Sequence, residues 1–366
     1  MERSQHERLV RFAGALIDQE KAQVIVPPNK PASGYWFGGG NLVEIDGTLY
    51  LVGRYRNAGD STTGLGKGER GLELAIFAST DGGHTFKKQL SWNKDRLGPE
   101  PGDVLSIEGA ALNVTSSGVE LFVSTEKRTR SYPEALAHYQ KPGTGVWSID
   151  RIAAPDIAGL AEADVAPLIE CDNPEYLHVK DPVVHTAGDG STVLLFCTHP
   201  FGWSSSNSAY CIRRAGEKTF GSPVYDFFGR GFTWDVAVSR ITDVLALPGS
   251  LLGADGTVQL VFYDGAECLR AHTENAAAVN RPRGYSCEEI GGLAVTTDDR
   301  WERLERISSL HPLFMSPYGS GSSRYVHTLA AERGIYAVWQ QAQNNGSQPL
   351  VMHFLSWDDT RRLLAG

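Results

Sequence analysis

The sequence lacks the features that would mark a membrane protein, a metal site or a nucleotide-binding site. No apolar run approaches the ~18 residues of a membrane-spanning helix, and no apolar segment of a signal peptide follows the charged start "MERSQHERLV". The five cysteines have no CxxC spacing, which argues against zinc and is typical of reduced thiols. The segment "GLGKGERG" (64–71) lacks the Lys-Ser/Thr ending of a phosphate-binding loop. We therefore expect a cytoplasmic protein that uses no cofactor and no catalytic metal; a structural calcium stays open.

A surplus of positive charge is also missing. The chain has 34 Lys and Arg against 43 Asp and Glu, a formal net charge of −9. Nucleic acids and acidic membrane surfaces both require a basic face, so we expect neither as a partner. A small carbohydrate fits this balance, either neutral or anionic and met by a local arginine cluster. The oligomeric state is not indicated by any pattern.

What the sequence does contain is a recurring hairpin among 40 glycines and 18 prolines. Each copy is a strand, a short turn with Gly and Asp, Ser or Glu, and a second strand. The copies occupy residues 41–56, 109–127, 181–199, 241–265 and 325–342. A second, weaker hairpin follows each copy, at residues 72–88, 145–153, 208–220, 291–307 and 350–363.

Four strands in each of five units predict an all-β fold, a five-bladed β-propeller of four antiparallel strands per blade. An open two-sheet sandwich is the competing fold. We expect one domain over 1–366, in which residues 1–33 lead in and close the ring. The expected blades cover about 34–100, 101–165, 176–226, 232–310 and 320–366.

The segment "STDGGHTF" (79–86) resembles the Asp-box of sialidases and other propeller enzymes. In that family the box is a structural turn between outer strands, away from the active site. Asp81 and the adjacent glycines suit a tight turn with an Asp-to-backbone hydrogen bond. We therefore expect a structural role for this segment.

Propeller topology predicts where the binding site lies. Each inner strand runs away from one rim, and the second strand returns to it, so the long polar loops after the second strands gather on that rim. Residues at the starts of the inner strands then converge on one axial pocket. The expected substrate contacts on this basis are Tyr35, Trp36, Asn41, Arg56, Lys180, His199, Asp235, Arg240, Arg324, Tyr325 and His327.

Two carboxylates across a pocket are the minimum for glycoside hydrolysis, one as the acid and one to activate water or to attack. Glu108 and Asp181 start the second and third blades, and neighbouring blades imply a separation of ~6–9 Å, which favours inversion. Crowding is expected to raise the pKa of one of them. Either Glu288 or Glu289 is the alternative candidate for the acid, and Asp243, Asp235 and Asp60 are the alternatives for the base.

The motifs "EG" (108–109), "KDP" (180–182) and "FYDG" with a later "GLAV" (262–265, 292–295) resemble the five-bladed propeller glycosidases. That group includes the arabinanases and xylosidases of glycoside hydrolase family 43, the fructan-cleaving enzymes of family 32 and the mannoside phosphorylases of family 130. Families 43 and 32 place an Asp at the start of the first blade, whereas this chain has "WFGGGN" there. The resemblance implies a glycosidase and a role for Asp181 that is either catalytic or auxiliary.

Three functions follow as hypotheses. The first is a glycoside hydrolase acting on a small oligosaccharide or glycoside in an axial funnel. The second is a propeller lyase that uses Tyr325 and His327 as base and acid, with Arg240 or Arg324 neutralising a carboxylate. The third is a propeller that binds sugar without catalysis.

Overall fold

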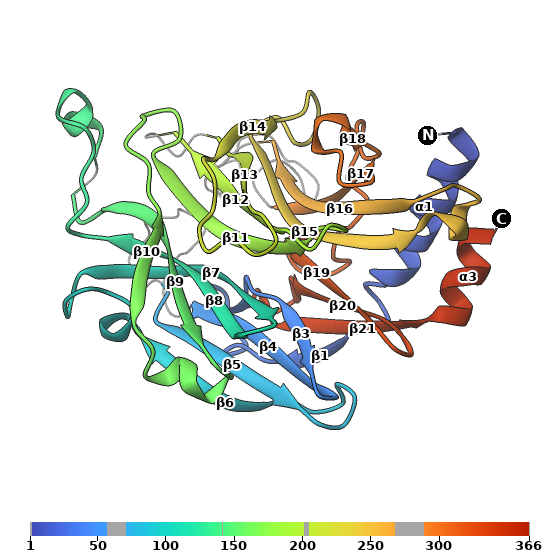
Figure 1. Ribbon diagram of the computed structural model, residues 1–366, viewed down its shortest axis with the longest axis horizontal. Coiled ribbons are helices and arrows are strands. Elements are labelled where there is room, and N and C mark those ends of the chain that lie inside the picture. Colours follow the sequence, from blue (N-terminus) through green and yellow to red (C-terminus); the bar gives the residue numbers. More distant parts are fainter. Residues whose placement is uncertain (1, 57–70, 141, 201–204, 268–288, 366) are drawn as a thin grey trace.

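The computed structural model describes residues 2–56, 71–140, 142–200, 205–267 and 289–365. Its strands form five separate antiparallel sheets arranged as the blades of a ring, which confirms the predicted five-bladed propeller (Figure 1). Across these residues, no helix has both the length and the apolar character needed to cross a membrane.

Blades 1 to 4 are each built from strands that follow one another in the chain. Blade 1 contains β2 (Trp36–Gly38), β3 (Leu42–Ile45), β4 (Thr48–Arg56), β5 (Glu73–Ser79) and β6 (Lys87–Asn93). Blade 2 contains β7 (Val104–Thr115), β8 (Gly118–Lys127), β9 (Val146–Ala154) and β10 (Val165–Ile169). Blade 3 contains β11 (His178–Thr186), β12 (Thr192–His199), β13 (Asn207–Arg213) and β14 (Val224–Phe228). Blade 4 contains β15 (Val238–Pro248), β16 (Thr257–Ala266), β17 (Ile290–Thr297) and β18 (Glu305–Arg306).

Blade 5 joins the two ends of the chain. Its strands β19 (Ser323–Ala331), β20 (Gly334–Gln341) and β21 (Leu350–Ser356) come from the C-terminal part, and its outer strand is β1 (Gln23–Val26). Val24 pairs with Val351 in antiparallel register. The backbone hydrogen bonds of one sheet therefore hold the first and last blades together.

The sequence prediction for residues 350–363 was partly wrong, because the segment is a strand followed by a helix. Helix α3 (Trp357–Ala365) begins directly after β21. Ser356 caps it, accepting a hydrogen bond from the backbone N–H of Asp359 at 3.1 Å, which satisfies one of the free donors of the first turn. The cap ends the strand, and β1 supplies the fourth strand instead.

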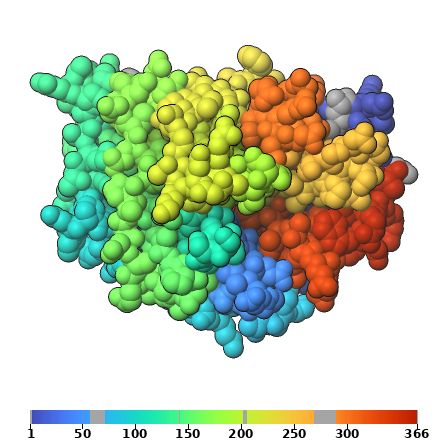
Figure 2. Space-filling view, in the orientation of Figure 1, coloured from blue at the N-terminus to red at the C-terminus, as the bar shows by residue number. Residues whose placement is uncertain are grey.

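An N-terminal helix was also missed. Helix α1 (Arg3–Leu16) buries Leu9, Phe12, Ala13 and Leu16, a spacing that places all four on one face. This face packs against the core of blades 4 and 5, and α1 contacts α3. Both ends of the chain therefore lie on the same side of the molecule (Figures 1 and 2).

The hydrophobic core is divided among the five junctions between neighbouring blades. Between blades 2 and 3, for example, Phe122 and Ile149 pack against Leu194 and Phe196. Between blades 5 and 1, Leu51 packs in one cluster with Val338. Because apolar burial contributes about 25 cal/mol per Å², this arrangement stabilises each junction and fixes the inner strands around the axis.

Candidate active site

The inner strand of every blade has one extra residue relative to its partner strand. In blades 2, 3 and 5 the register breaks around Glu108–Gly109, Asp181–Pro182 and Tyr325–Val326. In blade 4 it breaks at Thr242, and in blade 1 the residues 39–41 separate β2 from β3. A β-bulge bends a strand and redirects its side chains, and bulges are frequent next to active sites.

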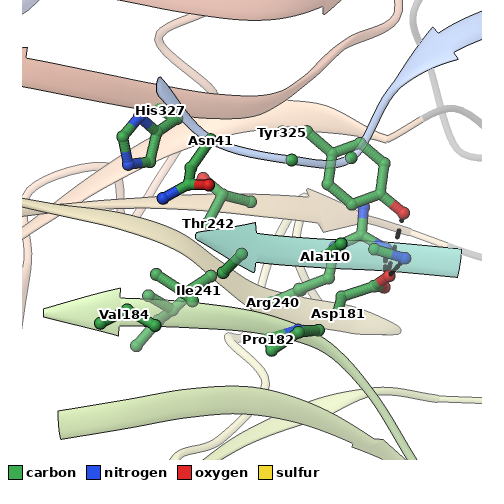
Figure 3. A pocket seen from close by; sticks show the side chains of 15 residues that line it. Asn41, Ala110, Asp181, Pro182, Val184, Arg240, Ile241, Thr242, Tyr325 and His327 are labelled. Carbon is green, nitrogen blue, oxygen red and sulfur yellow. Dashed lines mark hydrogen bonds and ion pairs between the residues drawn. The ribbon is translucent and has the colours of Figure 1, made fainter. Parts of the chain in front are cut away.

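These bulged segments together line a small pocket on the propeller axis, with a cavity volume of about 20 Å³. Asp181, Arg240 and Tyr325 lie at one end of it, joined by polar contacts (Figure 3). Asn41, Thr242 and His327 lie at the other end. This volume holds about one water molecule.

Asp181 is held in place from several sides. Its Oδ1 accepts a hydrogen bond from the backbone N–H of Gly109 at 3.0 Å, and its Oδ2 meets Nη1 of Arg240 at 3.1 Å. Lys180 lies 3.6 Å from the same Oδ2. Burial alone would raise the pKa of Asp181, but Lys180 and Arg240 lower it below its usual value. The group is therefore an ionised carboxylate facing the pocket.

The close contact at Asp181 requires a glycine in the neighbouring blade. A Cβ added to Gly109 would lie 2.6 Å from Oδ1 of Asp181, which is well inside van der Waals contact. The motif Glu108-Gly109 therefore combines a carboxylate with the one residue that lets Asp181 approach the backbone.

Glu108 pairs with two arginines of blade 1. Its Oε2 accepts from Nη2 and Nε of Arg54 at 2.6 and 3.0 Å, and its Oε1 lies 3.5 Å from Arg56. Burial would raise the pKa of Glu108, but Arg54 and Arg56 lower it below its usual range. The expectation that crowding raises the pKa of Glu108 or Asp181 was wrong, because the surrounding cations outweigh both the desolvation and the mutual repulsion.

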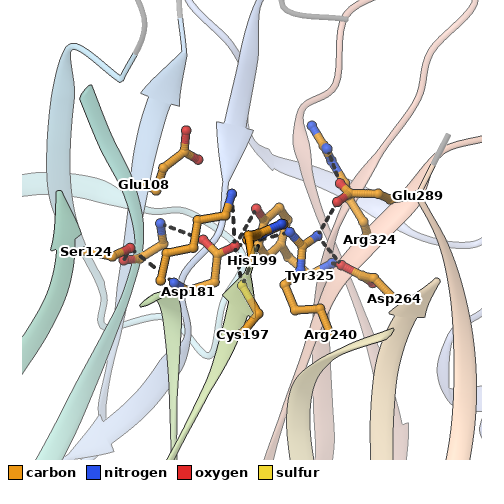
Figure 4. Close-up of polar contacts among 12 residues, drawn as sticks. Glu108, Ser124, Asp181, Cys197, His199, Arg240, Asp264, Glu289, Arg324 and Tyr325 are labelled. Carbon is orange, nitrogen blue, oxygen red and sulfur yellow. Dashed lines mark hydrogen bonds and ion pairs between the residues drawn. The ribbon is translucent and has the colours of Figure 1, made fainter. Parts of the chain in front are cut away.

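Two further carboxylates lie on the other side of Arg240. Asp264 and Glu289 meet its Nη2 at 2.7 and 3.0 Å, and Glu289 also pairs with Arg324 (Figure 4). Burial raises the pKa of Asp264 to about 6, and the nearby Glu289 adds to the effect. Burial would also raise the pKa of Glu289, but Arg240 and Arg324 lower it below its usual range.

Tyr325 links the carboxylates. Its hydroxyl lies 3.4 Å from Oδ2 of Asp181 and 3.4 Å from Nη2 of Arg54. The guanidinium of Arg240 lies over its ring, 4.1 Å from the centroid. Burial raises the pKa of Tyr325 to about 12, so its phenol keeps its proton at neutral pH.

Other predicted contacts lie around this cluster. Trp36 lies between Arg56 and Arg324, whose guanidinium carbons are 5.1 and 4.2 Å from its ring centroid. His199 is buried, and burial together with Lys180 lowers its pKa to about 3. Tyr35 is half-buried, with Lys30 over its ring at 5.6 Å.

Three of the predicted site residues form contacts that hold the fold together: Asn41, Asp235 and Asp243. Asn41 holds blade 1 to blade 2 through two hydrogen bonds with the backbone of Leu112, at 2.7 and 2.8 Å, although it also borders the pocket. Asp235 pairs with Arg306 at 2.9 Å.

Asp243 accepts from the backbone N–H of Thr328 at 2.8 Å and lies 3.3 Å from His327. Neither Asp235 nor Asp243 lines the pocket. Glu288 and Asp60 fall outside the described residues.

Sequence reasoning missed three groups at the site: Arg54 as the partner of Glu108, Asp264, and Cys197. The thiol of Cys197 lies 3.5 Å from Oδ2 of Asp181. A signal for Asp264 was present, because a charged residue follows the apolar run "LVFY" in the middle of β16. Within the described ranges, no group of three or more His, Cys, Asp or Glu residues is arranged to hold a metal ion.

Comparison with known proteins supports the fold. No protein-family model and no curated protein matches the sequence. Among solved structures, an α-L-arabinofuranosidase from Lactobacillus brevis is similar with a TM-score of 0.59 at 12% identity, covering 91% of this chain and 94% of that one. A thermostable family-43 glycoside hydrolase gives 0.54 at 12% identity, covering 91% and 94%.

A third structure agrees with these two. A xylan β-1,4-xylosidase from Bacillus halodurans gives a TM-score of 0.54 at 13% identity, covering 90% of this chain and 55% of that one. The predicted resemblance is thereby confirmed at the level of the fold. This chain has the five-bladed propeller architecture that is found in family-43 glycoside hydrolases.

Proposed function

We propose that the protein is a glycosidase that hydrolyses a small glycoside in the axial funnel. The observation that carries the proposal is that Glu108 and Asp181 come from bulges of neighbouring inner strands. Asp181 lines the pocket, and Glu108 is linked to it through Arg54 and Tyr325. Hydrolysis of a glycosidic bond requires carboxylates around the anomeric carbon. The fold shared with known glycoside hydrolases supports the same class of reaction, since propellers of this type present their inner-strand residues to the axis.

Asp181 is assigned the central role, because it is ionised and lines the pocket. An ionised carboxylate at that place activates water or stabilises the positive charge that develops on the sugar. Gly109 and Arg240 fix its orientation before substrate binds.

Glu108 and Tyr325 are assigned to proton transfer and positioning. Glu108 is ionised at rest, so it becomes an acid only when substrate weakens its pairing with Arg56, whose contact at 3.5 Å is the longest that it makes. Tyr325 carries a proton in the pocket and shares it with Asp181. The thiol of Cys197 donates a hydrogen bond to Oδ2 of Asp181 and so helps to hold that carboxylate in place.

We extend the proposal to an inverting outcome and a small substrate. Glu108 and Asp181 have separate sets of cations, and the link between them runs through Arg54 and Tyr325. This separation supports room for a water molecule, which inverting enzymes require. The pocket of about 20 Å³ leaves no room for a polymer to pass along the axis, which supports a small substrate bound at one end of it.

The test is incubation of the purified protein with a panel of 4-nitrophenyl glycosides that includes arabinofuranosides, xylosides and uronides. We expect release of nitrophenol and a reducing sugar, with the opposite anomer seen first by proton NMR. A product that absorbs in the ultraviolet as an unsaturated sugar would indicate the lyase. Sugar binding without turnover would indicate a binding protein, and both results contradict the proposal.

A further inference from the structure

Asp181, Arg240 and Tyr325 mark the end of the pocket that we call the pocket mouth. The cations in and around this group differ in how many acceptors they contact. Arg54 donates hydrogen bonds from Nε and Nη2 to Glu108 and from Nη1 to the backbone oxygen of Gly38. Arg240 contacts three carboxylates, those of Asp181, Asp264 and Glu289.

Arg324 is similarly well partnered. It pairs with Glu289 through Nη1, and its Nε and Nη2 meet the amide oxygen of Gln340 at 3.1 and 2.9 Å in the amide orientation that satisfies both groups. Three of the arginines at the mouth are therefore held by several acceptors each.

Arg56 is the exception. Among the residues that the structure describes, its one ion pair is the contact to Glu108 at 3.5 Å, and its Nε is buried without a hydrogen-bond partner there. Its side chain is only 11% exposed. A guanidinium offers five N–H donors, and donors that are removed from water need acceptors. Within the described part of the chain, the fold therefore keeps a buried N–H donor of this cation without an acceptor.

The groups that reach solvent at the mouth are mostly cations. Arg56, Lys180 and Arg324 have side chains that are 11%, 12% and 10% exposed. Among the four carboxylates of the cluster, Glu289 is 15% exposed, whereas the others are 5% or less. Within the described part of this cluster, an incoming molecule thus meets three positive groups and one negative group, although the chain as a whole has a net charge of −9.

Trp36 fixes the direction of Arg56. Its ring lies between Arg56 and Arg324, as described above, and the stacking of a guanidinium on an indole holds the fork in one plane. A planar fork presents two parallel N–H groups, which match the two oxygens of a carboxylate. The geometry therefore suits a planar anion better than a hydroxyl group.

We propose, as an addition that rests on the glycosidase function, that the sugar bound in this funnel carries a carboxylate and that Arg56 is its receptor. The class of substrate is a uronic acid glycoside. The carboxylate of the sugar supplies the acceptors that Arg56 lacks, and Trp36 keeps the guanidinium turned toward it.

Electrostatics support the same assignment. Burial lowers the pKa of Arg56, and the neighbouring charges of Arg54 and Arg324 lower it further, while Glu108 opposes the shift only in part. Arg56 stays charged, but its charge is less well stabilised in the empty protein than in water. A bound carboxylate relieves this cost, and it also draws Arg56 away from Glu108, which makes Glu108 easier to protonate.

The test is isothermal titration of the full chain with D-galacturonate and D-glucuronate, each compared with its neutral counterpart, D-galactose and D-glucose. We expect at least one uronate to bind about 10- to 100-fold more tightly than the matched neutral sugar. Arg56→Gln should remove that preference, and Arg56→Lys should restore part of it. Arg361→Gln, which removes the same charge from the exposed surface of α3, should leave it unchanged.

A thermal unfolding measurement separates binding from folding. Because Arg56 lacks partners, Arg56→Gln should have the same melting temperature as the wild type or a higher one without sugar, and no stabilisation by uronate. Equal binding of uronates and neutral sugars, or a preference that survives Arg56→Gln, would overturn the proposal. Titration measures binding and requires no turnover. Uronate binding without hydrolysis of any glycoside would therefore contradict the glycosidase proposal but not this inference. Hydrolysis of neutral glycosides at a rate that Arg56→Gln leaves unchanged would contradict this inference but not the glycosidase proposal.

Discussion

The hydroxyl of Tyr325 and the carboxylate of Asp181 meet at 3.4 Å, although 144 positions separate them in the chain. Both residues have a left-handed backbone, with φ of 53° and 54°. Such a conformation costs of order 1–3 kcal/mol in a residue other than glycine and is often found at functional sites. Here the bulges of β11 and β19 impose it, and in return the two side chains point at each other across the axis.

Tyr325→Phe tests the role of the hydroxyl group. The change keeps the ring and its stacking with Arg240, so we expect the free energy of unfolding to change by less than about 1.5 kcal/mol. The rate of glycoside hydrolysis should fall by about 10²-fold or more, because the hydroxyl group that contacts both Asp181 and Arg54 is lost. Urea unfolding and kcat measure the two effects, and an unchanged kcat would exclude Tyr325 from the reaction.

Glu108→Gln should destabilise the protein. The substitution leaves Arg54, 1% exposed, without the carboxylate that balances its charge. Removing one partner of a buried ion pair costs about 3–5 kcal/mol, and equilibrium unfolding in urea would show it. As a control, Glu7→Gln removes a carboxylate from an exposed pair on α1 and should change the stability very little. Similar stabilities for the two variants would contradict the strong pairing that we assign to Arg54 and Glu108.

The raised pKa of Asp264 predicts a pH-dependent contribution to stability. Its folded-state pKa of about 6 lies above the unfolded value of about 3.9, so the folded state holds the proton more tightly. The stability that the protonated form contributes is complete below pH ~4 and is lost as the pH rises through 6. Asp264→Asn cannot ionise and should lack this loss.

The measurement is the free energy of unfolding of wild type and Asp264→Asn between pH 4.5 and 7.5. The wild type should lose stability relative to the variant as the pH rises. A difference that is constant over this range, or one that changes in favour of the wild type, would mean that Asp264 has an ordinary or a lowered pKa in the folded protein.

The turn between β5 and β6 should matter for stability and not for activity. Asp81 accepts hydrogen bonds from the backbone N–H of Thr85 at 3.0 Å and from the hydroxyl groups of Thr85 and Ser79 at 2.6 and 2.7 Å. We expect Asp81→Ala to lower the melting temperature by several degrees, because the turn loses three acceptor contacts, and to leave kcat/KM unchanged. A loss of activity in a fully folded variant would show that this turn acts on the site.

Much of this architecture could be read from the sequence because its signals are local. The repeated hairpins with Gly-containing turns predicted five blades, and charged residues at strand starts pointed to Glu108 and Asp181. The helices had signals too: Leu9, Phe12, Ala13 and Leu16 follow the helical spacing, and Ser356 stands three residues before Asp359 at the start of α3. These signals were outweighed by the repeat pattern.

The rest of the site depends on contacts between blades, which spacing along the chain does not encode. Arg54 meets Glu108 from another blade, and that pairing reverses the expected direction of the pKa shift of Glu108. The same holds in part for Asp264, because Tyr325 comes from β19 of blade 5, whereas Arg240 is its cross-strand partner within blade 4. A sequence shows which residues are ionisable, whereas the sign of a pKa shift depends on which groups the fold brings within about 4–6 Å.

The most direct test of the central claim is the activity of Asp181→Asn on the glycoside that wild type hydrolyses best. The amide keeps the size of the side chain and its acceptor for the backbone N–H of Gly109, so the fold should persist, as far-ultraviolet circular dichroism will show. We predict that kcat falls by about 10³-fold or more, because the ionised carboxylate facing the pocket is lost. A folded Asp181→Asn that hydrolyses the substrate at the wild-type rate would contradict the assignment of this pocket as the active site.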